Sequence, residues 1–112
     1  MNRELLNDLI EVAKAGGTTT YGQIAPIVGL NMSYQDQRNT MSDILREISE
    51  NEHAQGRPML SAVVINKETG RPGKGFFELA RDLFIQKGED DDKFFKEELK
   101  RVYDYWRKKG DK

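Results

Sequence analysis

Residues 52–80 read EHAQGRPMLSAVVINKETGRPGKGFFELA, and this stretch decides the fold. The run MLSAVVI at positions 59–65 is short and rich in β-branched residues, which favours a β-strand. The next ten residues, NKETGRPGKG, are typical of turns, because they contain Asn66, Pro72 and three glycines. We therefore expect a β-hairpin with a short second strand at about residues 71–75.

Helical patterns lie on both sides of this segment. Upstream, apolar residues at positions 41, 44, 45 and 48 predict a third helix over about residues 36–53. Downstream, apolar positions 76–84 predict a fourth helix, and positions 95–106 predict a fifth that follows the acidic run GEDDD. A first helix is expected over positions 5–13, and Gly16 and Gly17 end it.

The segment TTTYGQIAPIVGL, residues 18–30, contains the start signal of a second helix. Thr20 and Gln23 have the spacing of a capping box, in which each side chain bonds the backbone N–H of the other residue. Pro26 falls beyond the first turn, so the helix is expected to start later or to kink there. Gly29 is expected to end it.

This order of elements is that of a winged helix: three helices plus a β-hairpin wing. We predict an α+β fold, winged-helix-like, with two additional C-terminal helices, and one domain over residues 1–112. Winged helices commonly bind nucleic acid, with the third helix in the major groove and the wing against the backbone. The same fold also serves as a protein–protein interaction module.

Periodicity also predicts which residues form the core. The residues expected to be buried together are Ile24, Val28, Ile44, Leu45, Ile48, Leu79 and Leu83. Two adjacent aromatic pairs, Phe76–Phe77 and Phe94–Phe95, cannot each share one helix face. One member of each pair is therefore expected to be exposed, as in a protein–protein interface.

Composition narrows the classes of function. The chain has 18 basic and 19 acidic residues, so only a local basic patch can attract nucleic acid. The absence of cysteine excludes thiol catalysis, disulfides and cysteine metal sites, and a single histidine excludes multi-histidine sites. The longest apolar run, residues 59–65, is too short to span a membrane, and the N-terminus does not read as a secretion signal. We expect a soluble cytoplasmic protein with no membrane partner and no cofactor.

The stretch TYGQIA at residues 20–25 resembles a more specific group, the alkylguanine-DNA alkyltransferases and their alkyltransferase-like relatives. In that family a TYG-x-[IV]-A segment precedes an arginine-bearing recognition helix, a PCHRV strand, a Gly-rich turn and a closing helix. The resemblance spans roughly residues 18–88. It implies that Tyr21 helps to displace a phosphate and that Arg38 matches the family's arginine. Met59 and Leu60 stand where the family has its catalytic cysteine and histidine, so alkyl transfer is excluded.

A second resemblance covers most of the chain. It is to a group of small bacterial proteins with an EHxxGRPxLSxVV segment, a PGxGFFxLA segment and a C-terminal aromatic helix. Here the two segments are EHAQGRPMLSAVV and PGKGFFELA. This resemblance implies no activity.

Two features allow a catalytic or phosphate-binding interpretation. His53, with Glu52 and Ser61 near it in sequence, allows a Ser-His-acid arrangement, but no nucleophile elbow surrounds Ser61. His53 is better explained as a favourable charge at the end of the third helix. The segment GRPGKG matches neither a Walker A loop nor GxGxxG, so it is either a phosphate-contacting wing tip or a plain turn.

The outer face of the third helix gives a mixed signal for DNA. Its start offers Gln35, Gln37, Arg38 and Asn39, which are residue types that read bases or bind phosphate. Its remainder offers Asp43, Glu47, Glu50 and Glu52, which repel phosphate. The acidic part therefore counts against a standard DNA-binding helix.

We interpret the chain as a non-enzymatic binding module whose functional surface lies over residues 57–75, with duplex DNA as the expected partner. The alternative is a protein–protein interaction module of a bacterial or phage protein with no DNA contact. No catalytic residue and no metal site is predicted. The candidate nucleic-acid-binding residues are Tyr21, Gln37, Arg38, Asn39, Arg57, Arg71 and Lys74.

Overall fold

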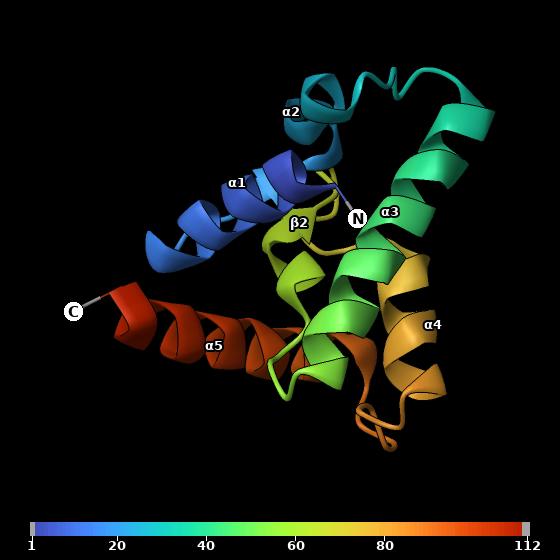
Figure 1. The fold of residues 1–112 in the computed structure, drawn as a ribbon. Coiled ribbons are helices and arrows are strands. Elements are labelled where there is room, and N and C mark those ends of the chain that lie inside the picture. Colours follow the sequence, from blue (N-terminus) through green and yellow to red (C-terminus); the bar gives the residue numbers. More distant parts are fainter. Residues whose placement is uncertain (1, 111–112) are drawn as a thin grey trace.

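The computed structural model describes residues 2–110 and places them in the general α+β class. In chain order its elements are α1 (Arg3–Lys14), β1 (Thr19–Thr20), α2 (Tyr21–Ile24), the 3₁₀ helix η1 (Ala25–Val28), α3 (Gln35–Ala54), the 3₁₀ helix η2 (Leu60–Val63), β2 (Val64–Ile65), α4 (Lys74–Asp82) and α5 (Asp91–Gly110). Figure 1 shows α3 beside α4, and α1 on the same side of the molecule as the far end of α5. η2 and β2 lie between these helices.

The helix boundaries expected in the first thirty residues are confirmed. The Asn2 side chain accepts a hydrogen bond from Leu5 N at 2.8 Å and so caps α1. The capping box at the start of α2 is present: Gln23 N donates to Thr20 Oγ1 at 3.2 Å, and Thr20 N donates to Gln23 Oε1 at 3.1 Å. Pro26 lies in η1, so the α-helix stops before it and a 3₁₀ turn continues the chain.

The partner of the strand at residues 64–65 differs from the expected one. β2 pairs in parallel with β1, with Thr19 opposite Val64 and Thr20 opposite Ile65. The expected hairpin is wrong, because within the described residues positions 71–75 form no strand and lead from a turn into α4. The expected strand at 59–65 is also shorter, since residues 60–63 form η2.

Local hydrogen bonding explains why no second strand forms. Pro72 has no N–H to give to a ladder. The N–H of Gly73 donates to the hydroxyl of Tyr21 at 2.8 Å instead of to a neighbouring strand. Asn66 N donates to Arg71 O at 2.8 Å, which closes residues 66–71 into a compact turn. Residues 66–73, which lead from β2 to α4, are called the 66–73 loop below.

One hydrophobic core joins the helices to η2 and β2. Of the predicted core residues, Ile24, Leu45, Ile48 and Leu79 are buried, whereas Val28, Ile44 and Leu83 are partly buried and pack against the same core. All four residues of η2 are buried. Leu60, Ala62 and Val63 belong to the hydrophobic core, whereas the polar Ser61 lines the cleft described below.

The expectation of exposed aromatic residues in two pairs is wrong. Phe76 and Phe77 are 7% and 4% exposed, and Phe94 and Phe95 are 0% and 8% exposed. The centre of the Phe76 ring lies 5.1 Å from that of Phe77 and 5.9 Å from that of Phe94, so the starts of α4 and α5 pack against each other. Where two helix ends pack together, two adjacent side chains of one helix are both buried. The apolar periodicity of that helix alone does not reveal this.

Two buried carboxylates fix the connection between α3 and η2. Glu52 is 1% exposed and accepts hydrogen bonds from Arg57 Nε at 3.1 Å and Nη2 at 2.8 Å. Glu98 of α5 is 2% exposed and accepts from Met59 N at 2.8 Å. These contacts hold η2 in place behind the cleft described next.

Candidate nucleic-acid interface

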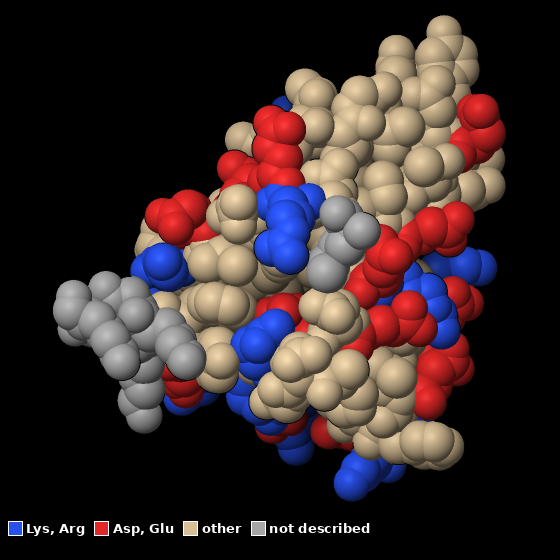
Figure 2. All heavy atoms as spheres, in the orientation of Figure 1, with Lys and Arg blue, Asp and Glu red and all other residues tan. Residues whose placement is uncertain are grey.

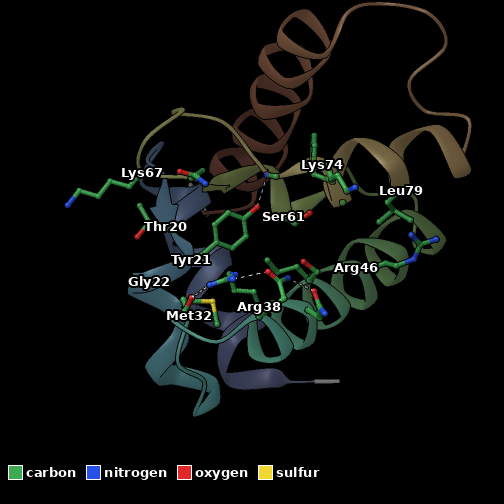
Figure 3. Close-up of a pocket in the computed structure, with 18 of the residues that line it drawn as sticks. Thr20, Tyr21, Gly22, Met32, Arg38, Arg46, Ser61, Lys67, Lys74 and Leu79 are labelled. Carbon is green, nitrogen blue, oxygen red and sulfur yellow. Dashed lines mark hydrogen bonds between the residues drawn. The ribbon is translucent and has the colours of Figure 1, made fainter.

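A cleft of about 570 Å³ opens between α2, the N-terminal part of α3, η2, the 66–73 loop and the start of α4. In Figure 3 the ring of Tyr21 occupies the middle of this cleft, with Arg38 beside it, while Lys67 extends away from it. Four of the seven predicted nucleic-acid-binding residues line the cleft: Tyr21, Arg38, Asn39 and Lys74. They come from three separate elements, so the fold, and not sequence proximity, brings them together.

Tyr21 joins α2 to the turn that precedes α4. Its hydroxyl accepts the hydrogen bond from Gly73 N and keeps its own proton available for a further partner. Burial raises the pKa of Tyr21 above its usual 10.0, although the hydrogen bond from Gly73 acts in the opposite direction. At neutral pH the hydroxyl is therefore a donor that faces the cleft.

The first turn of α3 holds a hydrogen-bonded group of polar side chains. Arg38 Nη1 donates to Met32 O at 2.7 Å, and Arg38 Nη2 donates to Gln35 Oε1 at 2.8 Å. Gln35 Nε2 then donates to Asn39 Oδ1 at 2.9 Å. Every partner in this group is neutral, so the positive charge of Arg38 is oriented without being cancelled.

The cleft is locally basic although the chain as a whole is not. Among the described residues that line it, Arg38, Arg46, Lys67 and Lys74 are basic and Glu68 is acidic. Arg46 is neutralised by Asp82 at 3.1 Å and by Glu50 at 3.4 Å. The face in Figure 2, by contrast, shows acidic and basic side chains interspersed and no continuous basic area. Because Arg46 is neutralised and Lys67 extends away, the charges that a phosphate would meet at the cleft are those of Arg38 and Lys74 against Glu68, a small positive excess.

The other three predicted residues, Gln37, Arg57 and Arg71, do not line the cleft. Gln37 Oε1 instead accepts from Asn31 N at 2.6 Å and fixes the loop before α3. Both arginines are held in ion pairs, Arg57 with the buried Glu52 and Arg71 with Asp92 of α5 at 2.6 Å. Their charges are therefore used within the fold.

The acidic residues of α3 lie on a different flank from its cleft-lining residues. Residues of α3 that line the cleft recur at positions 35, 38, 39, 42, 45 and 46, which is helical spacing along one flank. Asp43, Glu47 and Glu50 do not line it. A ligand in the cleft would thus meet the polar and basic flank of α3, and the repulsion expected from the acidic residues would be reduced.

His53 and Ser61 do not form a catalytic pair. His53 is exposed in the last turn of α3. Ser61 is buried, its hydroxyl lies 2.6 Å from that of Ser49, and its backbone N donates to Ser49 Oγ at 3.1 Å. Ser61 is thus held by a structural hydrogen bond at the back of the cleft.

Sequence reasoning did not include Gln35, Ser42, Asn66 and Lys67 among the candidate binding residues, although it named Gln35 at the start of the third helix and all four line the cleft. Gln35 and Ser42 share the helical spacing of Arg38 and Asn39, so the periodicity of α3 contained a signal for them. Asn66 and Lys67 gave no comparable signal, because the closure of the 66–73 loop determines their position.

Comparison with known proteins leaves the site to be interpreted from its geometry. No protein-family model, no curated protein and no solved structure matches this chain. Within residues 2–110, none of the helices combines the length and the apolar character required to cross a membrane.

Proposed function

We propose that this protein is a non-enzymatic module that binds duplex DNA with the face around the cleft. The observation that supports this most is the convergence of Tyr21, Arg38, Asn39 and Lys74 on one cleft with little acidic compensation. Cationic and neutral donors on one surface suit a phosphate backbone and the acceptor groups of base edges. The neutral hydrogen-bond partners of Arg38 leave its charge for such a contact.

The proposed complex uses both walls of the cleft. Lys74 at the start of α4 and Lys67 in the 66–73 loop are exposed and reach backbone phosphates. Arg38 and Asn39, on the opposite wall, face the groove. Tyr21 lies between the walls and donates its hydroxyl proton to a phosphate or a base. Arg57 and Arg71 take structural roles in this proposal.

The winged-helix interpretation belongs to the same proposal. The order α1, β1, α2, α3, η2 and β2 supports it, with the 66–73 loop in the place of a wing. The resemblance of TYGQIA to the alkyltransferase-like proteins supports it further, since Tyr21 and Arg38 line one cleft. With methionine at position 59 and no cysteine in the chain, the proposal is binding without alkyl transfer.

The experiment is a fluorescence-anisotropy titration with a labelled duplex, starting at about 50 mM salt, for the wild type and for Arg38→Ala and Lys74→Ala. Both variants should weaken binding. Lys74→Ala should also flatten the slope of log affinity against log salt by about 0.9, because it removes one phosphate contact. Lys96→Ala is the matched control, since it removes one exposed positive charge from α5, away from the cleft. It should leave the slope unchanged.

Two outcomes would contradict the proposal. Absence of wild-type binding at low salt would remove its basis. An equal effect of Lys96→Ala and Lys74→Ala would show that DNA responds to overall charge and not to the cleft.

A protein–protein interaction module without DNA contact is the second candidate, and Phe84 is the observation that favours it. Phe84 is 79% exposed and has a φ of 59°, a backbone conformation that residues other than glycine rarely adopt. The paired phenylalanines that the sequence offered for this role are buried. If the wild type binds no duplex, Phe84 becomes the first position at which to test for contact with another protein.

A further inference from the structure

The hydrogen-bond directions at the start of α3 follow from one chemical fact. A guanidinium group has donors only. The Gln35 atom that faces Arg38 must therefore be the carbonyl oxygen Oε1, at 2.8 Å from Nη2. This orientation turns Gln35 Nε2 toward Asn39, so the Asn39 atom that receives it at 2.9 Å is the oxygen Oδ1. Arg38 thus sets the orientation of both amides.

The hydrogen-bonding groups of these side chains that remain free are mostly donors. Arg38 has five N–H groups, of which one bonds Met32 O and one bonds Gln35 Oε1. Gln35 uses one N–H of its amide for Asn39. The amide N–H groups of Asn39 have no bond within the described residues, and its oxygen, which accepts one hydrogen bond from Gln35, keeps a second lone pair. The cleft-facing end of α3 therefore offers N–H groups from three side chains and few acceptors.

We propose that this network holds Arg38 as a donor-only reader that selects guanine in the major groove. The proposal rests on the proposed function and names the ligand chemistry of the same site. Guanine presents two acceptors there, N7 and O6, whereas adenine presents the acceptor N7 next to the donor N6. An asparagine reads adenine by accepting from N6 and donating to N7. Arg38 has no acceptor for the N6 donor of adenine, whereas its remaining N–H groups suit both acceptors of guanine. The oxygen of Asn39 already accepts one hydrogen bond from Gln35, so it keeps only one lone pair for such a contact.

Gln35 is a positioning residue in this proposal. It holds the guanidinium of Arg38 on the cleft-facing flank through its oxygen, and its amide N–H orients the side chain of Asn39. Backbone phosphates also accept hydrogen bonds, but contacts to them carry no sequence information. The exposed Lys67 and Lys74 on the opposite wall supply the phosphate contacts, so Arg38 and Asn39 are assigned to base edges.

The test compares three duplexes of equal length: one rich in G·C pairs, one rich in A·T pairs, and the G·C-rich duplex with 7-deazaguanine in place of guanine. The 7-deaza substitution removes the N7 acceptor and keeps every phosphate. The wild type should bind the G·C-rich duplex at least about fivefold more tightly than the A·T-rich one, the lower limit for one bidentate contact. The 7-deaza duplex should lose most of this preference.

Variants then test the role of Gln35. Gln35→Ala should reduce the preference for G·C-rich duplex, and Gln35→Ala should have little further effect in an Arg38→Ala background, because the two residues act through one contact. Gln55→Ala is the matched control, since Gln55 is exposed and lies just after the opposite end of α3. It should keep the wild-type preference.

The outcomes separate this inference from the proposed function. Equal binding of all three duplexes, weakened equally by Arg38→Ala, would show that the donors contact phosphates, and it would overturn the inference alone. A preference that survives Gln35→Ala would overturn the positioning role. Absence of binding by the wild type would overturn the proposed function and this inference together.

Discussion

Arg38 and Arg57 lie near opposite ends of α3, and the sequence nominated both for nucleic-acid binding, yet their surroundings differ. Arg38 donates to a backbone carbonyl and to an amide oxygen, both neutral. Arg57 makes two hydrogen bonds to Glu52, which is 1% exposed. One arginine keeps its charge for an external partner, and the other neutralises a buried carboxylate of its own fold.

The comparison teaches that the partner of an arginine decides its availability more than its own exposure does. Arg71 shows the intermediate case: its side chain is 43% exposed, yet it is paired with Asp92. Exposed ion pairs contribute little to stability, whereas removal of one partner of a buried pair leaves an uncompensated charge. The three arginines therefore predict three different responses to truncation.

Arg57→Ala should have the largest effect in this comparison. It leaves the Glu52 carboxylate buried without a partner, so the free energy of unfolding should fall by about 3 kcal/mol. Arg38→Ala should change it by less than about 0.5 kcal/mol, as is usual for an exposed position. Urea denaturation followed by circular dichroism measures both values.

A double substitution sharpens this test. Glu52→Leu combined with Arg57→Met replaces the pair by apolar side chains and should recover most of the stability lost in Arg57→Ala. If Arg57→Ala and Arg38→Ala destabilise the protein equally, the proposed difference between the two arginines is wrong.

Tyr21→Phe addresses a contact in which neither partner is charged. It keeps the ring but removes the acceptor for Gly73 N, so the free energy of unfolding should fall by about 1 kcal/mol. Tyr34→Phe is the control, because Tyr34 is 56% exposed. It should be nearly neutral in the same urea titration, and an equal loss in both variants would contradict a specific role for the Tyr21 hydroxyl.

Arg71→Ala should have a still smaller effect. Its bond to Asp92 of α5 is short at 2.6 Å, but the two side chains are 43% and 64% exposed. A loss of about 0.5 kcal/mol or less is expected, and it should vanish at high salt, where exposed ion pairs are screened. A salt-independent loss would show that Arg71 acts through packing, for example by holding the 66–73 loop.

Helix positions could be predicted from the sequence, because they depend on local signals. The Thr20–Gln23 capping box and the apolar spacing of α3 act over three to eight residues. The absence of the expected hairpin could not be predicted from local signals. The Gly73 N–H that a second strand would need is bonded to Tyr21, which lies fifty-two residues from Gly73 in the sequence. The burial of Phe76 and Phe94 likewise depends on contact between α4 and α5.

The residues of the candidate site also divide into those that local signals predict and those that depend on tertiary contacts. The sequence nominated Arg38 for its place at the start of the third helix and Arg57 for its place in the expected functional surface, and it did not show that only one of the two charges is used within the fold. The pairing of Arg57 with Glu52 spans only five residues, but it requires the chain to turn after α3 so that the carboxylate is buried. Burial of the partner is a tertiary property, so composition and spacing do not provide it.

The smallest expected effect is the response of the Tyr21 contact to alkaline pH. Burial raises the pKa of Tyr21 in the folded protein above the usual 10.0. The folded state thus holds this proton more tightly than the unfolded state, so the contribution to stability is complete below about pH 10 and is lost as the pH rises through the folded-state pKa. Burial also raises the pKa of Tyr103, whose hydroxyl donates to Gly17 O at 2.7 Å.

Wild-type protein should therefore lose more stability between about pH 9 and pH 11 than Tyr21→Phe or Tyr103→Phe, and the double variant should lose the least. All other ionisable groups are common to the four proteins, so their effects on stability cancel in the differences. Chemical denaturation at a series of pH values gives the comparison. If Tyr21→Phe follows the wild-type curve, the cleft hydroxyl ionises as freely in the folded protein as in the unfolded chain, and the burial of Tyr21 makes no pH-dependent contribution to stability.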